Sequence, residues 1–321
     1  MKTLEYKRSW EKGEIDKKTY WTGMREGCTS VLPQLQKLLM ESEDCDSISI
    51  TRDACILEKK NGLRLFFDFS QTICRAEADL IMGRDAEKED MDYVIRYLQE
   101  HDGSVMLDIG ANVGLFSLEI CQTEKDLTCH VFEPIPCTFE MLKKTAELNG
   151  ADPSWYHVYN IGMSDETGTV DFYLPAASEA ASLQPVNDEF YLRESDENGE
   201  YTGKNSMQRV ECLVDTVDHF VNENHINRVS FVKIDVEGNE KAVLTGAQET
   251  LKKYRPLVYC ELLRKHAKRF GYHPNDVIAL MKALGYECRT IIGKEMTDVK
   301  EISENTEETN FFFFPIKKDQ G

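Results

Sequence analysis

The chain has 321 residues, of which 41% are hydrophobic and 30% charged, enough for one large α/β domain with an N-terminal extension. The formal net charge of −19 would repel nucleic-acid phosphates and anionic membrane surfaces, so we expect neither as a partner. There is no apolar run of about 18 residues, no secretory signal at the start, and no C-x-x-C pair among the ten cysteines, so we expect a cytoplasmic protein.

The first 79 residues predict an extension that precedes a main domain at 80–321. Apolar residues recur at helical spacing up to about residue 45, and residues 47–51 then alternate like a strand. The apolar runs 55–58 and 63–67 flank Asn61 and Gly62, a pair typical of a β-hairpin turn. We therefore expect a helical and β-hairpin extension.

The main domain alternates between helices and strands, which predicts an α/β fold with a mostly parallel sheet. The expected strands are 105–109, 128–133, 155–159, 229–235, 256–261, 286–292 and 310–316. The expected helices are 87–99, 113–122, 137–149, 214–224, 239–253 and 274–284. The last strand contains four consecutive phenylalanines and should be buried on both faces. Residues 175–208 break the pattern, and we interpret them as a lid-like insertion.

A glycine turn follows the strand at 105–109. Asp108 stands near the end of this strand, where its carboxylate could accept hydrogen bonds from turn amides or from a ligand ammonium group. Gly110 and Gly114 would let the backbone approach a ligand closely. A helix beginning near residue 113 would present free N–H groups and a partial positive charge to that ligand.

A second acidic residue, Glu133, follows the next strand and precedes Pro134. An acid at this place can accept hydrogen bonds from both hydroxyls of a ribose, so the two features predict a nucleoside-bearing cofactor. The turn has the spacing G-x-x-x-G and lacks the middle glycine that a pyrophosphate requires. Because Asp108 also suits a cationic amino-acid group, we expect S-adenosylmethionine rather than NAD.

Further acidic residues, Asp235, Glu237 and Glu261, follow the strands 229–235 and 256–261. Ligands of open α/β sheets bind beyond the carboxyl ends of the strands, so these acids could line one crevice. They could orient the cofactor's ammonium group, act as a general base, or hold a divalent metal through oxygen ligands, and these alternatives stay open. Glu240 is expected to stabilise a helix N-terminus.

Basic residues cluster at 255–269, and we interpret them as a solvated helix face rather than a phosphate site. His266 lies within this stretch. It is a weaker candidate base, because a lone histidine among basic residues is more often on the surface.

Three segments resemble the FkbM family of S-adenosylmethionine-dependent methyltransferases: LDIGANVG at 107–114, FEP at 132–134 and KIDVEGNE at 233–240. The similarity continues through 160–168, 243–247 and 255–261, and it covers about residues 77–265. The resemblance implies a Rossmann-like class I methyltransferase fold, with a seven-stranded sheet, an antiparallel last strand and helices on both faces. It also implies O-methylation of a hydroxyl group on a sugar, glycan or secondary metabolite.

The resemblance further assigns roles to individual residues. Gly110, Ala111, Asn112 and Gly114 would pack on the methionine part and the ribose of the cofactor, and Asp108, from its place at the strand end, stands beside them as a candidate cofactor-binding residue. Glu133 with Pro134 would bind the ribose hydroxyls, and Ile161 with Gly162 would border the adenine. Asp235 would lie near the methionine and the transferred methyl group. The candidate catalytic residues are Asp235, Glu237 and Glu261, and a metal bound by these three is neither required nor excluded.

Other function classes are weaker. Methyltransferases that act on amino groups of nucleic-acid bases usually carry an Asn/Asp-Pro-Pro-aromatic tetrad, where this chain has DVEG at 235–238. A methyltransferase of amino groups or proteins nevertheless stays an alternative. So does a non-catalytic Rossmann-like binding protein, although acids at four strand ends weigh against it.

Overall fold

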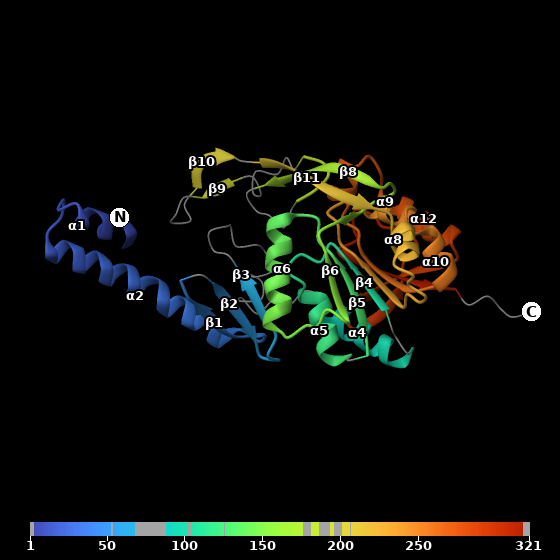
Figure 1. The fold of residues 1–321 in the computed structure, drawn as a ribbon, viewed down its shortest axis with the longest axis horizontal. Coiled ribbons are helices and arrows are strands. Elements are labelled where there is room, and N and C mark those ends of the chain that lie inside the picture. The colour runs from blue at the N-terminus through green and yellow to red at the C-terminus, as the bar shows by residue number, and fades with distance from the viewer. Residues whose placement is uncertain are drawn as a thin grey trace, which may run out of the picture.

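The computed structural model describes residues 3–52, 54–67, 88–101, 105–124, 126–175, 181–185, 193–195, 201–205 and 207–316. The strands of its main sheet are β4 (Val105–Ile109), β5 (Thr128–Phe132), β6 (Tyr156–Tyr159), β12 (Phe231–Ile234), β13 (Leu257–Glu261), β14 (Tyr286–Ile292), β15 (Glu295–Asp298) and β16 (Asn310–Pro315). Their order across the sheet is β15-β14-β16-β13-β12-β4-β5-β6 (Figure 1).

The strand directions confirm the topology that the resemblance implies. Strands β6, β5, β4, β12 and β13 run parallel to one another. Strand β16 is antiparallel to both β13 and β14, between which it lies. β15 adds an eighth strand at the edge, antiparallel to β14. The carboxyl ends of β4, β5, β12 and β13 therefore meet at one edge of the sheet, where the candidate site residues stand.

Helices cover both faces of the sheet (Figure 1). On one face lie α4 (Lys88–Glu100), α5 (Leu115–Thr123) and α6 (Pro136–Leu148). On the other lie α8 (Val217–Glu223), α9 (Glu240–Thr245), α10 (Gln248–Tyr254) and α12 (Pro274–Ala283). Successive residues of a strand face opposite sides of the sheet. Met106 of β4 therefore packs on the side of α4, α5 and α6, and Leu107 packs on the side of α8, α9, α10 and α12.

The phenylalanine-rich strand β16 is buried as predicted. Phe311, Phe312 and Phe313 are each 0% exposed. Phe312 packs with the α4–α6 side, and its two neighbours pack with the α8–α12 side. The apolar run thus reflects a strand whose two faces both belong to the core.

Two of the differences between the predicted helices and the structure lie next to glycines. The helix expected from residue 113 begins at Leu115, because Asn112 and Gly114 adopt left-handed backbone angles of 53° and 81° in φ. The helix expected over 239–253 is two helices, α9 and α10. Gly246, a poor helix former, lies at the break, and a Cβ there would meet the carbonyl oxygen of Ser164 at 2.1 Å.

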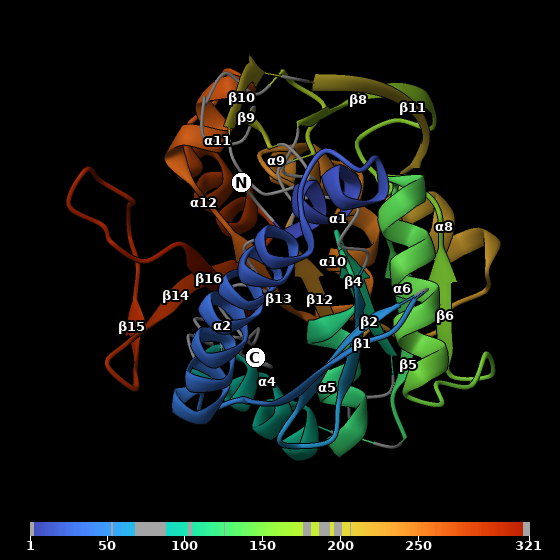
Figure 2. The same ribbon diagram turned by 90° about the vertical axis from the view of Figure 1, so that its left-hand side faces the viewer.

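A second sheet, which the sequence analysis did not predict, follows β6. It contains β7 (Gly162–Met163), β8 (Gly168–Pro175) and β11 (Met207–Asp215) in the order β7-β11-β8. The two short strands β9 (Arg193–Ser195) and β10 (Tyr201–Asn205) pair with each other. These sheets lie together at the top of the molecule in both views (Figures 1 and 2).

The predicted insertion at 175–208 is therefore not one loop. It contains β9, β10 and the first residues of β11. Because β11 continues to Asp215, the helix that we expected from residue 214 begins only at Val217. Much of the remaining insertion, residues 176–180, 186–192 and 196–200, lies outside the described residues.

The N-terminal part consists of α1 (Thr3–Glu11), α2 (Lys17–Glu41), β1 (Cys45–Ile50), β2 (Cys55–Lys59) and β3 (Arg64–Phe67). The predicted hairpin is confirmed, since β2 and β3 pair antiparallel, and β1 joins them on the other side of β2. This small sheet packs against α6, where the Phe66 N–H donates to Oγ1 of Thr145 at 3.1 Å. The expected boundary between residues 79 and 80 lies outside the described residues.

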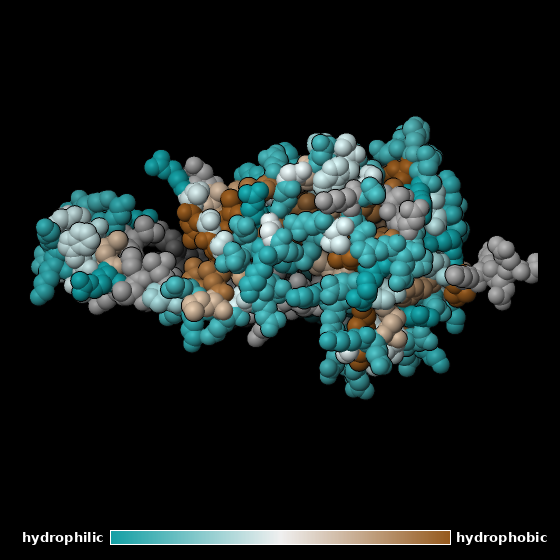
Figure 3. Space-filling view, turned by 90° about the horizontal axis from the view of Figure 1, so that it is seen from below, coloured by the Kyte–Doolittle hydropathy of each residue, from teal (hydrophilic) through white to brown (hydrophobic). Residues whose placement is uncertain are grey.

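The two N-terminal helices, α1 and α2, project from the rest of the molecule (Figure 1). The molecular face seen in Figure 3 is mostly hydrophilic, and apolar side chains gather on it near the base of these helices. In the part of the chain that the structure describes, no helix combines the length and the apolar character needed to cross a membrane.

Candidate active site

The glycine turn after β4 brings two strand ends together. Gly110 has a φ of 79°, and a Cβ on it would lie 1.8 Å from the carbonyl oxygen of Asp235. Gly114 has a φ of 81°, and its Cβ would lie 2.5 Å from Cδ1 of Leu142. The closest neighbours of both glycines are thus other parts of the protein, and not the ligand that their positions in the sequence led us to expect. A side chain at either position would disrupt the packing of the turn.

The Glu133 carboxylate is held in place by backbone amides at the end of β5. Its Oε2 accepts a hydrogen bond from the N–H of Asn112 at 3.1 Å, and its Oε1 accepts one from the N–H of Ile135 at 2.9 Å. The side chain is buried, and burial raises its pKa to about 7 although both amides favour the charged form. A buried carboxylate with lone pairs left over is suited to accept hydrogen bonds from ligand hydroxyl groups.

Lys233 is a buried residue of β12 that was not among the predicted site residues. Its Nζ lies 3.7 Å from Oδ1 of Asp108 and 3.3 Å from Oδ2 of Asp235. Asp108 is 0% exposed, and burial raises its pKa although Lys233 opposes this effect. Asp108 therefore has no surface from which to contact a ligand in this structure and serves as a buried partner of Lys233. A buried lysine between apolar strand residues was the sequence signal for this group.

Glu237 stands in the turn that follows β12. Its φ is 55°, an unusual backbone conformation for a residue other than glycine. Its Oε2 lies 3.1 Å from Nδ1 of His266 and 3.5 Å from Nη2 of Arg269. Burial, and then the nearby charge of Asp235, raise the pKa of Glu237 to about 8. The turn therefore holds an acidic side chain against two basic ones.

The basic partners of Glu237 come from α11 (Arg264–Arg269). His266 is 6% exposed, and burial, followed by the charges of Arg269 and Lys265, lowers its pKa to about 3. The expectation that His266 lies on the surface is therefore wrong. The interpretation of the 255–269 stretch as a solvated face is also wrong in part, since Arg269 pairs with Glu237 and Arg255 donates to carbonyl oxygens of Leu284 and Gly285, both at 2.6 Å.

Gly238 explains how α11 reaches the turn. Its φ is 112°, and a Cβ on it would lie 2.6 Å from the ring of Phe270 and 2.9 Å from the carbonyl oxygen of His266. The lack of a side chain at this position therefore allows the helix to pack directly on the turn and places His266 beside Glu237.

Glu240 supports the same turn from inside, as predicted for a residue at a helix N-terminus. Its Oε1 accepts a hydrogen bond from the N–H of Gly238 at 2.8 Å, and its Oε2 accepts one from the hydroxyl of Tyr272 at 2.8 Å. Glu240 is the first residue of α9 and is only 2% exposed. Its contacts are structural, whereas the neighbouring Glu237 faces the site.

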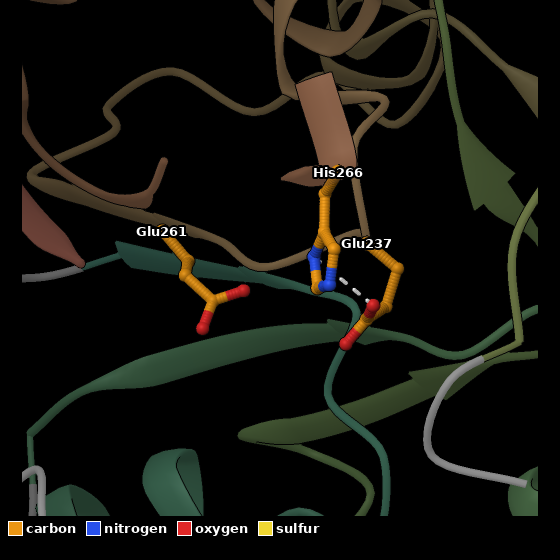
Figure 4. A group of neighbouring side chains, drawn as sticks. All are labelled: Glu237, Glu261 and His266. Atoms are coloured by element: carbon orange, nitrogen blue, oxygen red, sulfur yellow. Dashed lines mark ion pairs between the residues drawn. The ribbon is translucent and has the colours of Figure 1, made fainter. Parts of the chain in front are cut away.

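Glu261 is the last residue of β13, directly beside the end of β12. One ligand atom from each of Glu237, Glu261 and His266 lies within 4.8 Å of the others. Figure 4 shows the Glu261 carboxylate directed into the same space as the imidazole, with the Glu237 carboxylate on the other side of the ring. The predicted trio was Asp235, Glu237 and Glu261. Among the described residues, the structure groups His266 with the two glutamates, while Asp235 pairs with Lys233.

The segment after β6 lies next to the Glu133 loop. Asn160 donates from Nδ2 to the carbonyl oxygens of Glu133 and Pro134, both at 2.9 Å. A Cβ on Gly162 would lie 3.3 Å from Cβ of Pro134. Ile161 and Gly162 are therefore close to the proposed ribose site, as a border of the adenine would be. Asn160 was missed as a residue that positions this loop.

One described part of the insertion reaches the site. Ser182 pairs with Tyr173 in an isolated β-bridge and donates its hydroxyl to the carbonyl oxygen of Glu237 at 3.1 Å. Ser182 thus lies against the turn that carries Glu237. This contact supports the hypothesis that the insertion covers the site, which stays a prediction for the rest of 175–208.

Among known proteins, two curated methyltransferases and one solved methyltransferase structure are similar to this chain. Over 171 residues the chain is 28% identical to the 31-O-demethyl-FK506 methyltransferase FkbM of Streptomyces tacrolimicus, covering 49% of this chain and 64% of that protein. Over 190 residues it is 27% identical to the hexuronic acid methyltransferase AglP of Haloferax volcanii, covering 59% and 66%. The crystal structure of a methyltransferase FkbM from Methylobacillus flagellatus aligns with a TM-score of 0.41 at 16% identity, covering 66% of this chain and 44% of that one.

The chain therefore spans just under two thirds of the length of these two curated relatives. The family model of the methyltransferase FkbM domain matches residues 108–288, which include the glycine turn, Glu133 and the Glu237, Glu261 and His266 group. With more than half of its residues matched by this model, the chain belongs to the FkbM methyltransferase family.

Proposed function

We propose that this protein is an S-adenosylmethionine-dependent O-methyltransferase that acts on a hydroxyl group of a sugar, glycan or secondary metabolite. The observation that carries the proposal is the Glu133 carboxylate, which two backbone amides fix at the end of β5 beside the glycine turn. Family membership supports the reaction type.

The residues present fit the cofactor. Glu133 is buried and preorganised, and two ribose hydroxyls would donate to the lone pairs that the backbone amides leave available. Pro134, Ile161 and Gly162 would border the base, and Gly110, Ala111, Asn112 and Gly114 would shape the turn around the methionine part. Lys233 would hold Asp108 and Asp235 so that the ends of β4 and β12 keep their spacing.

When bound, S-adenosylmethionine supplies an electrophilic methyl group for attack by an oxygen nucleophile. The protein must then align the acceptor hydroxyl and accept its proton. Glu237, Glu261 and His266 lie together beyond the ends of β12 and β13 and offer proton-accepting oxygen and nitrogen atoms. Asp235 is less suited to accept this proton, because its carboxylate pairs with Lys233.

The acceptor class is inferred from two relatives, whose names give 31-O-demethyl-FK506 and a hexuronic acid as the compounds that they methylate. Ser182, which contacts the Glu237 carbonyl, places part of the insertion beside the site. We infer that the insertion contributes to the choice of acceptor.

The first experiment is a calorimetric titration of the purified protein with S-adenosylhomocysteine, S-adenosylmethionine and NAD in parallel. We expect micromolar binding of both sulfur nucleosides and no binding of NAD. A screen of hydroxylated sugars, glycans and metabolites for release of S-adenosylhomocysteine then tests turnover.

The outcomes separate the alternatives. Binding of NAD alone, or of no nucleoside, would overturn the proposal. Tight cofactor binding without turnover on a broad panel of hydroxyl acceptors would favour a non-catalytic binding protein, and turnover on amines or a protein substrate would favour N-methylation.

A further inference from the structure

The group formed by Glu237, Glu261 and His266 has the composition of a metal site. It offers two carboxylates and one imidazole from three separate segments: the turn after β12, the end of β13 and helix α11. Imidazole and carboxylate ligands together suit divalent transition ions such as Mn²⁺ more than Mg²⁺, which prefers oxygen ligands.

The distances fit such an ion. Two ligands of one metal with bonds of about 2.1 Å lie about 3 Å apart when they bind at right angles. Nδ1 of His266 lies 3.1 Å from Oε2 of Glu237, and all three ligand atoms lie within 4.8 Å of one another. The Glu261 side chain is partly exposed at the end of β13.

An independent observation comes from the histidine itself. His266 is 6% exposed, yet its Nδ1 forms no aligned hydrogen bond with any described residue, despite lying near the Glu237 carboxylate (Figure 4). A buried ring nitrogen normally has a hydrogen-bond partner. A cation held between the imidazole and the carboxylates would satisfy this nitrogen.

The surroundings would orient these ligands. Arg269 donates from Nη2 to the carbonyl oxygen of Glu237 at 3.1 Å, and Ser182 donates to the same oxygen. Gly238 allows α11 to pack on the turn. Arg269 also lies 3.5 Å from Oε2 of Glu237, so it would reduce the negative charge of the site and moderate its affinity.

We propose that Glu237, Glu261 and His266 bind one divalent transition-metal ion at the edge of the proposed acceptor site. Its role rests on the proposed function. With the ion bound, the three side chains would be its ligands and would no longer be the proton acceptors. The ion would hold the oxygen of the acceptor hydroxyl and lower the pKa of that hydroxyl, whose proton would pass to solvent water. The binding of the metal itself does not depend on that role.

The test is a titration of the full, chelator-treated chain with MnCl₂, with free Mn²⁺ followed by electron paramagnetic resonance. We expect saturable binding of one ion per chain and weaker binding of Mg²⁺. His266→Ala and Glu261→Gln should each weaken Mn²⁺ binding by about tenfold or more. Glu249→Gln, at an exposed acid of α10, is the matched control and should leave binding unchanged.

Absence of saturable binding would overturn the proposal, and so would unchanged affinity in both site variants. Glu261→Gln keeps the shape of a partly exposed side chain, so it remains informative if His266→Ala does not fold. Titration of the metal-free protein with S-adenosylhomocysteine separates the two proposals. Nucleoside binding without Mn²⁺ binding would reject only the metal site, whereas Mn²⁺ binding without nucleoside binding would reject only the cofactor assignment.

Discussion

The backbone N–H of Asn112 donates to Oε2 of Glu133 at 3.1 Å, across 21 positions of the sequence. This hydrogen bond joins the glycine turn after β4 to the acid after β5. The turn thus holds in place the carboxylate that we propose as the acceptor of hydrogen bonds from the ribose hydroxyls. A substitution in the turn should therefore also disturb the position of Glu133.

Glu133→Ala should weaken S-adenosylhomocysteine binding by about tenfold or more, because contacts to two hydroxyl groups are lost in a buried site. Calorimetric titration of the variant measures the effect, and Glu140→Ala, at an exposed residue of α6, is the control. An affinity equal to that of the wild type would show that the ribose binds elsewhere.

Glu133→Gln should change how stability depends on pH. Burial raises the pKa of Glu133 from 4.5 to about 7, so the folded state binds more protons than the unfolded state between these pH values. The contribution of Glu133 to stability therefore falls as the pH rises through this window, by about 3 kcal/mol in total.

The glutamine variant lacks this titration. Its free energy of unfolding should increase relative to that of the wild type as the pH rises from about 4.5 to 7, and the difference should then stay constant. Urea unfolding of both ligand-free proteins at a series of pH values tests this. Parallel pH profiles would mean that Glu133 is not held in its protonated form.

Lys233→Met should destabilise the fold by about 3–5 kcal/mol, because it removes the buried cation near Asp108 and leaves that buried acid without its counter-charge. Thermal or urea unfolding measures the loss, with Lys252→Met, at an exposed lysine of α10, as the control. Adding Asp108→Asn should recover part of the stability. A double variant no more stable than Lys233→Met would argue against the ion pair as the cause.

Glu237→Gln should leave the affinity for S-adenosylhomocysteine almost unchanged and should slow methyl transfer by about a hundredfold. The side chain lies beside His266 and Arg269 and forms none of the contacts that hold the Glu133 carboxylate. Once an acceptor is known, steady-state rates and calorimetry give the two values. Unchanged turnover would remove Glu237 from the mechanism.

Gly238→Ala should destabilise the protein by about 1–3 kcal/mol and reduce turnover, because the φ of 112° is unfavourable for alanine and the new methyl group would meet Phe270. Gly168→Ala is the matched control, since a Cβ there has no neighbour within 4 Å. Unfolding curves of the two variants test the difference. Equal free energies of unfolding for the two variants would show that the backbone of the turn adjusts to a side chain at position 238.

The sequence predicted the main sheet well because its strands are apolar runs that end in acids or glycines. Leu107, Val131 and Ile234 precede the site residues in such runs, and the alternation with helices then limits the topology to parallel strands. The second sheet was missed because β8 and β11 are mixed in polarity. In β11 the signal was the alternation of Val210 and Cys212 with the polar Arg209 and Glu211, and the exposed Leu213 interrupts this alternation before Val214.

The grouping at the site could be predicted only in part. Strand ends bring Glu237 and Glu261 together, since β12 and β13 are neighbours, and this follows from topology. The position of His266 depends instead on how closely α11 packs on Gly238, which no local pattern specifies. Likewise, the charge of Asp235 gave no indication that its partner would be the buried Lys233.

The place of β16 has a consequence for how the chain is made. Residues 310–315 pair with β13 on one side and β14 on the other, so the last strand inserts between two strands that are synthesised before it. The chain must therefore have emerged from the ribosome as far as residue 315 before the sheet can close. During that interval the facing edges of β13 and β14 are open, and the nascent protein depends on rapid capture of its phenylalanine-rich segment to avoid pairing with other chains.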